Sequence, residues 1–280
     1  MRLALTLSLV LLAFAGNSVL ARLALTEGLA GPWTFSLIRF ASGAGVLLLI
    51  SRHSWSAGRW RAAVALCVYG VLFSYAYLEL ATGLGALLLF ASVQLTMLIW
   101  ARVRGEELST RQILGGGLAL LGLGALLSPG LAAPPLFWAA IMVLAGVGWG
   151  AYSVLGKSEG DATARTAGNF ARAAVLLLAL SPLVLWRTPE ALPSATGLGL
   201  AVLSGTVTSA LGYALWYRVL RDISVTTAAL SQLSVPVIAA IGGAVFVFEP
   251  VTLEFAVSCA VVLFGVGLAT LKPQVKTQAG

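Results

Sequence analysis

Long apolar runs, each about the length needed to cross a lipid bilayer, follow one another along almost the whole chain. A helix requires about 20 consecutive apolar residues to span the hydrocarbon core, and short polar connections separate the runs. Thr82 and Gly83 alone separate the third run from the fourth, which predicts a tight antiparallel hairpin there. We therefore predict an all-α polytopic membrane protein with ten transmembrane helices. They are expected at residues 3–24, 32–50, 61–81, 84–101, 111–128, 134–156, 166–186, 195–217, 225–247 and 253–271.

The composition excludes a water-soluble domain. Only 10% of the 280 residues are charged and 59% are hydrophobic, whereas soluble domains carry about 25% charged residues. The net charge of +7 resides in short clusters between apolar runs, not in a basic patch interleaved with aromatic residues. We therefore expect a lipid bilayer as a partner and no nucleic acid.

Lysine and arginine are distributed unequally between the two sides of the predicted bundle. With the N-terminus in the cytoplasm, 13 of the 17 fall in cytoplasmic segments, and only Arg22 and Arg187 fall on the other side. Arg39 and Arg172 lie within apolar runs. Because cytoplasmic loops carry an excess of Lys and Arg, we predict that both termini are cytoplasmic, in the inner (plasma) membrane of a bacterium.

Two parts of the chain resemble each other in the order of their polar residues. At an offset of 142, residues 92–94 (SVQ) align with residues 234–236 (SVP). At a similar offset, Arg39 aligns with Arg172. These correspondences predict an internal duplication.

The duplication divides the chain into two halves of five predicted helices each. We place the first repeat at residues 1–130, the second at 134–272, and a cytoplasmic tail at 273–280. Because five is odd, the second repeat starts from the opposite side of the membrane, so the repeats are inverted. Inverted repeats recur in transporters that expose a midplane site alternately to either side.

Several short motifs resemble those of the drug/metabolite transporter superfamily, EamA type. They are residues 16–18 (GNS), 37–40 (LIRF), 105–109 (GEELS), 149–150 (WG) and 229–236 (ALSQLSVP). Members of this family often carry proline in both the fourth and the ninth span, whereas this chain has Gln94 in the fourth and Pro236 in the ninth. The resemblance implies ten helices with both termini cytoplasmic, and export of small metabolites, amino acids among them.

Polar, charged and aromatic side chains inside the apolar runs are the candidates for a substrate cavity. Arginine within hydrocarbon is costly and often functional, and the Arg39 or Arg172 guanidinium could meet a carboxylate of a substrate or of Glu79. Helix–helix hydrogen bonding, or anchoring at the headgroups for the arginines, is the alternative role. The candidates are Asn17, Arg39, Tyr75, Glu79, Ser92, Gln94, Trp149, Tyr152, Asn169, Arg172, Tyr213, Trp216 and Gln232.

The predicted ninth helix carries the candidate hinge of the protein. Pro236 lies inside it and removes one backbone hydrogen bond, which allows a kink. Gly242 and Gly243 follow and could let this helix bend. Glycines elsewhere, such as the pair Gly146 and Gly150, are expected to let helices pack closely.

No combination of residues in the chain indicates catalysis or metal binding. Cys67 and Cys259 lie in separate apolar runs and His53 is the single histidine, so we expect no metal site, no cofactor and no enzymatic activity. The leading interpretation is a secondary transporter that exports a small polar metabolite, with amino acids as the expected class, by alternating access through a central cavity. It is expected to be a monomer or a weak homodimer.

Three other functions stay open. Efflux of amphipathic or cationic drugs is the alternative within transport, although it usually calls for acidic residues in the cavity. An intramembrane enzyme or a structural membrane protein fits the sequence less well. Because no carboxylate falls near the predicted midplane, we expect facilitated transport or exchange and not obligatory proton antiport.

Overall fold

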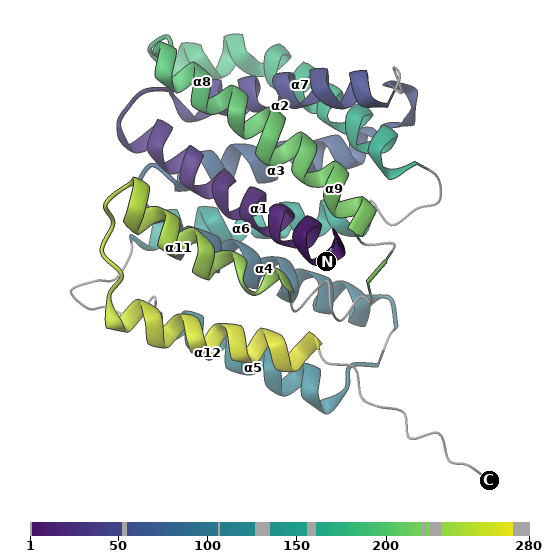
Figure 1. Cartoon of the computed structure of the whole chain (residues 1–280), viewed down its shortest axis with the longest axis vertical. Coiled ribbons are helices and arrows are strands. Elements are labelled where there is room, and N and C mark those ends of the chain that lie inside the picture. Colours follow the sequence, from purple (N-terminus) through teal and green to yellow (C-terminus); the bar gives the residue numbers. More distant parts are fainter. Residues whose placement is uncertain are drawn as a thin grey trace.

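The computed structural model of the chain describes residues 2–51, 55–105, 107–126, 135–155, 161–219, 222–223 and 231–270. Every regular element in these ranges is a helix, which confirms the predicted all-helical class for the described part of the chain. His53 and the predicted tail at 273–280 lie outside the described residues. The helices run side by side in one elongated bundle (Figure 1).

The elements follow one another with short connections. They are α1 (Arg2–Thr26), α2 (Pro32–Ile50), the 3-10 helix η1 (Trp55–Ala57), α3 (Trp60–Ala76), α4 (Thr82–Val103), α5 (Thr110–Leu126), α6 (Leu136–Leu155), α7 (Ala162–Arg187), α8 (Ala195–Leu203), the π-helix η2 (Ser204–Leu211), α9 (Gly212–Val219), α11 (Val235–Phe246) and α12 (Leu253–Thr270). Because α8, η2 and α9 join without a gap, they form one continuous helical rod.

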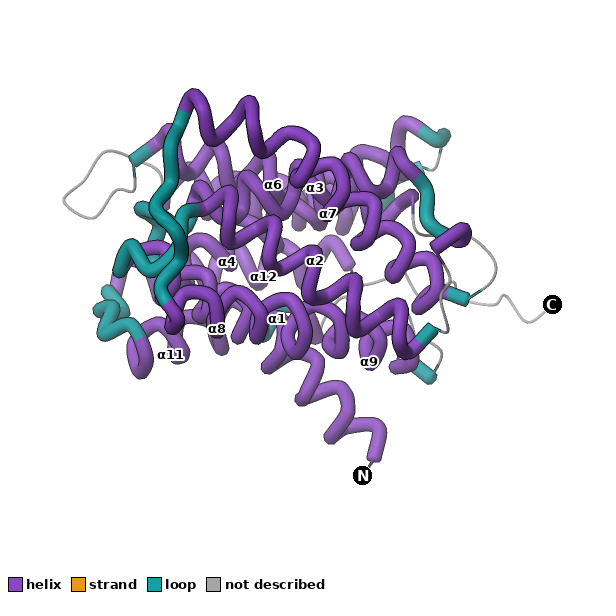
Figure 2. The backbone as a smooth tube through the Cα atoms, turned by 90° about the horizontal axis from the view of Figure 1, so that it is seen from above, coloured by secondary structure: helices purple, strands orange, loops and turns teal. Residues whose placement is uncertain are grey.

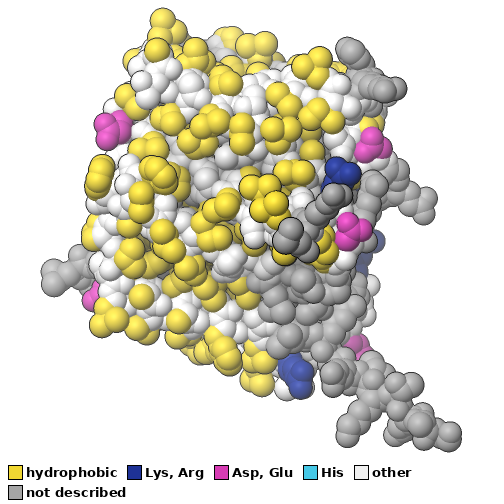
Figure 3. Space-filling model, viewed as in Figure 1, with side chains coloured by type: hydrophobic (Ala, Val, Ile, Leu, Met, Phe, Trp, Pro, Cys, Tyr) yellow, Lys and Arg dark blue, Asp and Glu magenta, His cyan; other side chains and the backbone are white. Residues whose placement is uncertain are grey.

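Six helices are long and apolar enough to cross a membrane: α1, α2, α4, α6, α7 and the rod from α8 to α9. The apolar helices α3, α11 and α12 are shorter. Large apolar side chains such as Leu121 and Leu178 are exposed. In Figure 3, hydrophobic side chains cover the visible face, and the few charged ones lie near its margins. This surface fits a multi-pass membrane protein, while the number of ten transmembrane helices stays a prediction.

Helices of the first half of the chain pack against helices of the second half. α2 packs on α7 and α5 packs on α12, and these pairs lie at opposite ends of the long axis (Figure 1). Between them, α3 and α4 pack on α6, while α1 packs on α11 and on the rod from α8 to α9. Figure 2 shows the first turns of α1 projecting beyond the bundle.

The turn between α3 and α4 differs from the predicted one. Thr82 and Gly83 do not separate the helices, because they are the first two residues of α4, and residues 77–81 form the turn. The backbone N–H of Thr82 donates to the Glu249 carboxylate (2.7 Å), and a side chain at Gly83 would meet Ala240 of α11. Contacts with the second half therefore allow α4 to begin earlier than its own sequence indicates.

Pro236 also differs from its predicted position inside a long helix. α11 begins at Val235, so that Pro236 lies in its first turn, after a turn at Leu233 and Ser234. The N–H of Ile238 donates to the Ser234 carbonyl (2.9 Å). Because proline lacks an N–H and suits the first helical turn, it starts this helix instead of bending it. Residues 224–230 of the predicted helix lie outside the described residues.

Close packing at glycine confirms one further prediction. A Cβ at Gly146 of α6 would lie 2.5 Å from the Ser92 Cβ of α4, and one at Gly150 would lie 2.8 Å from Thr96. These separations are shorter than van der Waals contact, so the backbone of α6 approaches α4 as only glycine allows.

Candidate functional site

A cavity lies between helices of the two halves, and we call it the aromatic cavity. It encloses about 380 Å³ of space not filled by atoms. Its walls come from α1, α3, α4, α6, η2 and α9. They consist of Phe14, Asn17, Ser18, Tyr69, Phe73, Leu89, Phe90, Trp149, Thr208 and Tyr213.

Asn17 joins three elements at the wall of the cavity. Its Oδ1 accepts hydrogen bonds from the hydroxyls of Ser204 (2.6 Å) and Thr208 (3.3 Å) in η2. Its Nδ2 donates to the hydroxyl of Tyr69 in α3 at 3.4 Å. A buried amide is costly unless it is hydrogen-bonded, and this network satisfies it with groups from both halves of the chain.

Arg39 lies fully buried behind the same wall. Its Nε donates to the Ser209 hydroxyl (3.0 Å) and its Nη2 donates to the Tyr69 hydroxyl (2.9 Å). The guanidinium carbon lies 5.2 Å from the centre of the Tyr69 ring and 5.1 Å from that of Phe73, within the range of cation–π attraction. Since both rings line the cavity, the positive charge stands directly behind its wall.

Aromatic rings form the remaining wall as a connected set. The Trp149 ring centre lies 4.9 Å from that of Tyr69 and 4.9 Å from that of Tyr213. Phe14 contacts Tyr213 edge-on at 5.8 Å. These rings offer flat apolar faces beside the polar groups of Asn17 and Tyr69, so the cavity can accommodate a ligand with one polar and one apolar end.

The π-helix supplies three hydroxyls that sequence analysis missed: Ser204, Thr208 and Ser209. The wider turn of a π-helix changes which residues share a face, and such turns are frequent at functional sites. The run of small hydroxyl residues in 204–209 (SGTVTS) was a usable signal, because polar side chains in an apolar run need partners. Tyr69 and Phe73 were also missed, since one aromatic residue in an apolar run looks like another.

A second cavity, of about 300 Å³, lies where α3 and α7 begin and α6 ends. We call it the inner pocket, because these ends belong to the predicted cytoplasmic side. Arg59, Arg165, Tyr152 and Asn169 contribute to its lining. The Asn169 Oδ1 accepts the Arg59 backbone N–H at 2.7 Å.

Arg172 lies in α7, one turn from Asn169, and is held by the protein itself. Its Nη1 donates to the carbonyls of Trp55 and of Gly168 (3.1 Å for the latter). Its guanidinium carbon lies 4.9 Å from the Trp55 ring centre and 5.5 Å from that of Trp60. The two arginines aligned in the sequence thus have different neighbours.

The structure brings about half of the predicted site residues together. Asn17, Trp149 and Tyr213 line the aromatic cavity and Arg39 lies behind it, while Tyr152 and Asn169 line the inner pocket. The remaining candidates that line neither cavity are Tyr75, Glu79, Ser92, Gln94, Arg172, Trp216 and Gln232.

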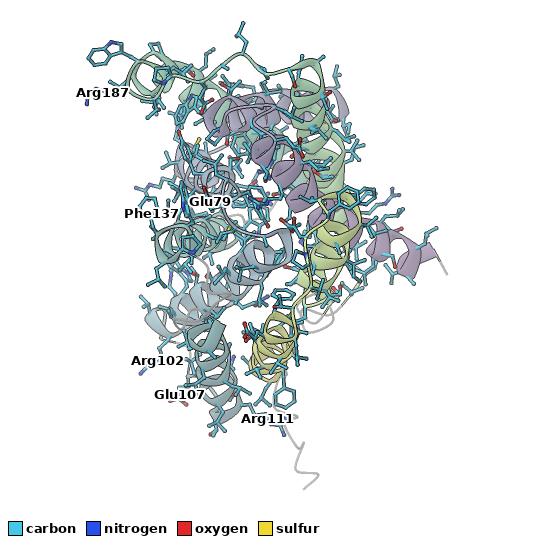
Figure 4. The ribbon with its side chains drawn as sticks, turned by 90° about the vertical axis from the view of Figure 1, so that its left-hand side faces the viewer. Glu79, Arg102, Glu107, Arg111, Phe137 and Arg187 are labelled. Atoms are coloured by element: carbon cyan, nitrogen blue, oxygen red, sulfur yellow. The ribbon has the colours of Figure 1, made fainter. Side chains whose placement is uncertain are left out.

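Several of these remaining residues have identifiable surroundings. Glu79 is exposed; Figure 4 labels it in a view along the helices, with Arg187 and Arg111 toward opposite ends of the long axis. The Ser92 hydroxyl donates to the Leu88 carbonyl of its own helix (2.6 Å). Trp216 contacts Phe14 edge-on at 5.8 Å, next to the cavity wall.

The candidate hinge glycines lie at contacts between helices. A Cβ at Gly242 would meet the Val19 side chain of α1 at 2.6 Å. One at Gly243 would meet Glu249 (2.6 Å) and Thr82 (2.8 Å). Both glycines therefore let α11 approach the first half closely, whatever their part in a movement.

Known proteins resemble this chain over almost its whole length. The family model of the EamA-like transporter family matches residues 136–271. The uncharacterized protein PA1977 of Pseudomonas aeruginosa is 45% identical over 93% of this chain and 91% of its own length. An uncharacterized transporter of Archaeoglobus fulgidus is 25% identical over 96% of this chain and 97% of its own.

A solved crystal structure shares the fold. It aligns with 98% of this chain and 99% of its own chain, with a TM-score of 0.66 and 21% sequence identity. The family match, the relatives and the apolar helical bundle agree with one another. The chain belongs to the EamA-like transporter family of multi-pass membrane proteins.

Proposed function

We propose that this membrane transporter is a secondary carrier that exports small polar metabolites, with amino acids as the first class to test. Alternating access through the aromatic cavity is the proposed mechanism. The observation that carries the proposal is the composition of the cavity wall. Asn17 and Tyr69 come from the first half of the chain, whereas Trp149, Thr208 and Tyr213 come from the second. A relative movement of the halves would open this wall to one side or the other.

The reciprocal packing of the helices supports two structurally related halves. If α1 to α5 correspond in order to α6, α7, the rod from α8 to α9, α11 and α12, each contact between the halves has a counterpart. α3 packs on α6 as α1 packs on the rod, and α4 packs on α6 as α1 packs on α11. The pairs α2–α7 and α5–α12 are their own counterparts. A two-fold axis relating the halves would produce this pattern.

We infer from this pattern that residues 1–130 and 134–272 are inverted repeats of five helices each. The family model, at residues 136–271, falls almost on the second of them. In Figure 1, α1 begins and α12 ends at the same end of the bundle, which supports the proposal that both termini are cytoplasmic. The expected location is a bacterial inner membrane, and the expected state is a monomer or a weak homodimer.

The charge around the cavity favours metabolites over cationic drugs. The described lining of the aromatic cavity contains no carboxylate, and the Arg39 cation stands behind it. A cationic ligand would meet an unfavourable potential there. For the same reason we propose exchange or facilitated transport, because no titratable carboxylate lines the cavity to couple flux to protons.

Counterflow in liposomes tests the proposal. The purified protein is reconstituted into liposomes preloaded with an unlabelled amino-acid mixture, and uptake of each labelled amino acid is compared with that of labelled tetraphenylphosphonium. We expect saturable uptake of at least one amino acid above that of protein-free liposomes, and none of the cation. Uptake of the cation alone, or of neither class by folded protein, contradicts the proposal. Accumulation driven by a pH gradient alone contradicts the exchange mechanism.

A further inference from the structure

Arg39 carries a charge into the protein without a carboxylate to balance it. The side chain has no exposed surface, and within the described ranges the one ion pair joins Arg22 to Glu249. The Arg39 Nη1 also lacks a hydrogen-bond partner there. A buried and unbalanced charge costs several kcal/mol. The hydroxyls and rings that surround Arg39 reduce this cost but supply no negative charge.

The hydroxyl of Tyr69 connects this charge to the cavity. It accepts a hydrogen bond from Arg39 Nη2 (2.9 Å) and a longer one from Asn17 Nδ2 (3.4 Å). A tyrosine hydroxyl has one proton of its own to donate, and no acceptor for it occurs among the residues that the structure describes. The guanidinium polarises the O–H bond, which makes this proton a stronger donor toward an anion.

The second arginine shows that this arrangement is specific. Arg172, which aligns with Arg39 in the sequence, donates to the Trp55 and Gly168 carbonyls and lies against two tryptophan rings. Those contacts tie α7 to the connection between α2 and α3. Arg39, in contrast, binds the hydroxyl of a cavity-lining residue.

We propose that Tyr69, with Arg39 behind it, is the binding site for the carboxylate of the transported solute. The inference rests on the proposed function and deepens it by naming the substrate class. The Tyr69 hydroxyl donates to the carboxylate, and Arg39 supplies the balancing charge. The rings of Phe14, Trp149 and Tyr213 then face the apolar part of the solute. The expected substrates are small carboxylates with an apolar body, and amines without a carboxylate are excluded.

Three ligands of similar shape separate the charge from the apolar contacts. They are 4-methylpentanoate, its amide 4-methylpentanamide, and the amine 3-methylbutylamine. The apparent melting temperature of the purified full-length protein is measured against the concentration of each, because a ligand that binds the folded state raises it. We expect stabilisation by the carboxylate and none by the amide or the amine.

Two variants and one control locate the site. Tyr69→Phe keeps the ring contacts but removes the hydroxyl, and it is expected to weaken carboxylate binding about ten- to a hundredfold. Arg39→Gln is expected to weaken it at least as much, and Tyr69→Phe carries the test alone if Arg39→Gln does not fold. Tyr77→Phe is the matched control, because the Tyr77 hydroxyl donates to the Thr82 carbonyl (3.2 Å) and lies outside the described lining of the cavity. It is expected to bind 4-methylpentanoate within about twofold of the wild type.

Each contrary result has a distinct meaning. Equal stabilisation by the amide, no stabilisation by the carboxylate, or wild-type binding by Tyr69→Phe overturns the carboxylate site. Counterflow of the same three compounds separates this failure from that of the proposed function. If 3-methylbutylamine is carried, the protein is a transporter without this site; if 4-methylpentanoate binds but nothing is carried, the site stands without the proposed function.

Discussion

Arg22 of α1 and Glu249, in the connection between α11 and α12, form an ion pair with 2.8 Å between Nε and Oε1. The Arg22 Nη1 also donates to the carbonyls of Tyr77 and Leu78, each at 2.9 Å. The second Glu249 oxygen accepts the N–H of Thr82 at the start of α4. A single carboxylate therefore ties α1, the turn after α3, and α4 to the second half of the chain, and holds this end of the bundle closed.

Removing the charge of Glu249 should loosen this end. Glu249→Gln leaves the side-chain volume unchanged but replaces the charge-assisted bond to Arg22 with a neutral one, so we expect the folded state to lose about 1–3 kcal/mol. Thermal unfolding in detergent measures the loss. Glu254→Gln is the matched control, because Glu254 is an exposed carboxylate on the neighbouring helix α12. Equal melting temperatures for the two variants would show that the ion pair contributes nothing.

A second glutamate, Glu190, caps a helix across the same boundary. Its two oxygens accept the backbone N–H groups of Trp33 and Thr34, each at 2.9 Å, while Gly31, which precedes α2, offers no side chain to cap it. We expect Glu190→Ala to lower stability by about 0.5–2 kcal/mol, as the loss of a helix cap does. Glu27→Ala, on an exposed turn of the same connection, is expected to leave stability unchanged. Thermal unfolding of both variants decides, and a larger loss for Glu27→Ala would contradict the capping role.

The helical bundle could be predicted because its cause lies within each segment. Backbone groups in lipid must be satisfied internally, so an apolar run of sufficient length becomes a helix. α2 begins and ends at the predicted residues 32 and 50, since Pro32 fixes its first turn. The start of α4 could not be predicted, because the carboxylate that caps Thr82 comes from a residue 167 positions later in the chain.

The site was harder to predict than the fold, because the same residue type can face lipid, a neighbouring helix or a cavity. Tyr75 and Tyr69 lie in the same helix, yet the sequence pointed to Tyr75 and the structure places Tyr69 in the cavity wall. Arg39 and Arg172 look equivalent in the sequence, and only the contacts of the folded chain distinguish them. The register of the π-helix likewise depends on packing against α1 and α2.

The contact between α5 and α12 depends on glycine, which gives a third prediction. A Cβ at Gly265 would lie 2.6 Å from the Ala119 nitrogen and 2.7 Å from the Gly115 oxygen. Gly265→Val must push the helices apart, so we expect a loss of about 1–3 kcal/mol. The control is Gly117→Val, since a Cβ there would have no neighbour within 4 Å. Thermal unfolding compares the two variants, and equal stability would mean that the helices do not approach this closely.

Asn17 should matter for transport more than for folding, because its partners form the cavity wall. Asn17→Leu removes the acceptor of the Ser204 and Thr208 hydroxyls and the donor to Tyr69, so the polar side of the cavity loses its alignment. We expect counterflow to fall about tenfold, which corresponds to the loss of about one hydrogen bond to the solute. Thr206→Val is the matched control in the same π-helix, because the Thr206 hydroxyl donates only to the Val202 carbonyl of its own rod (2.8 Å). Flux is compared at equal protein content in the liposomes. A tenfold fall in Thr206→Val as well would assign the effect to the helix itself, whereas unchanged flux in Asn17→Leu would place the transport path outside the aromatic cavity.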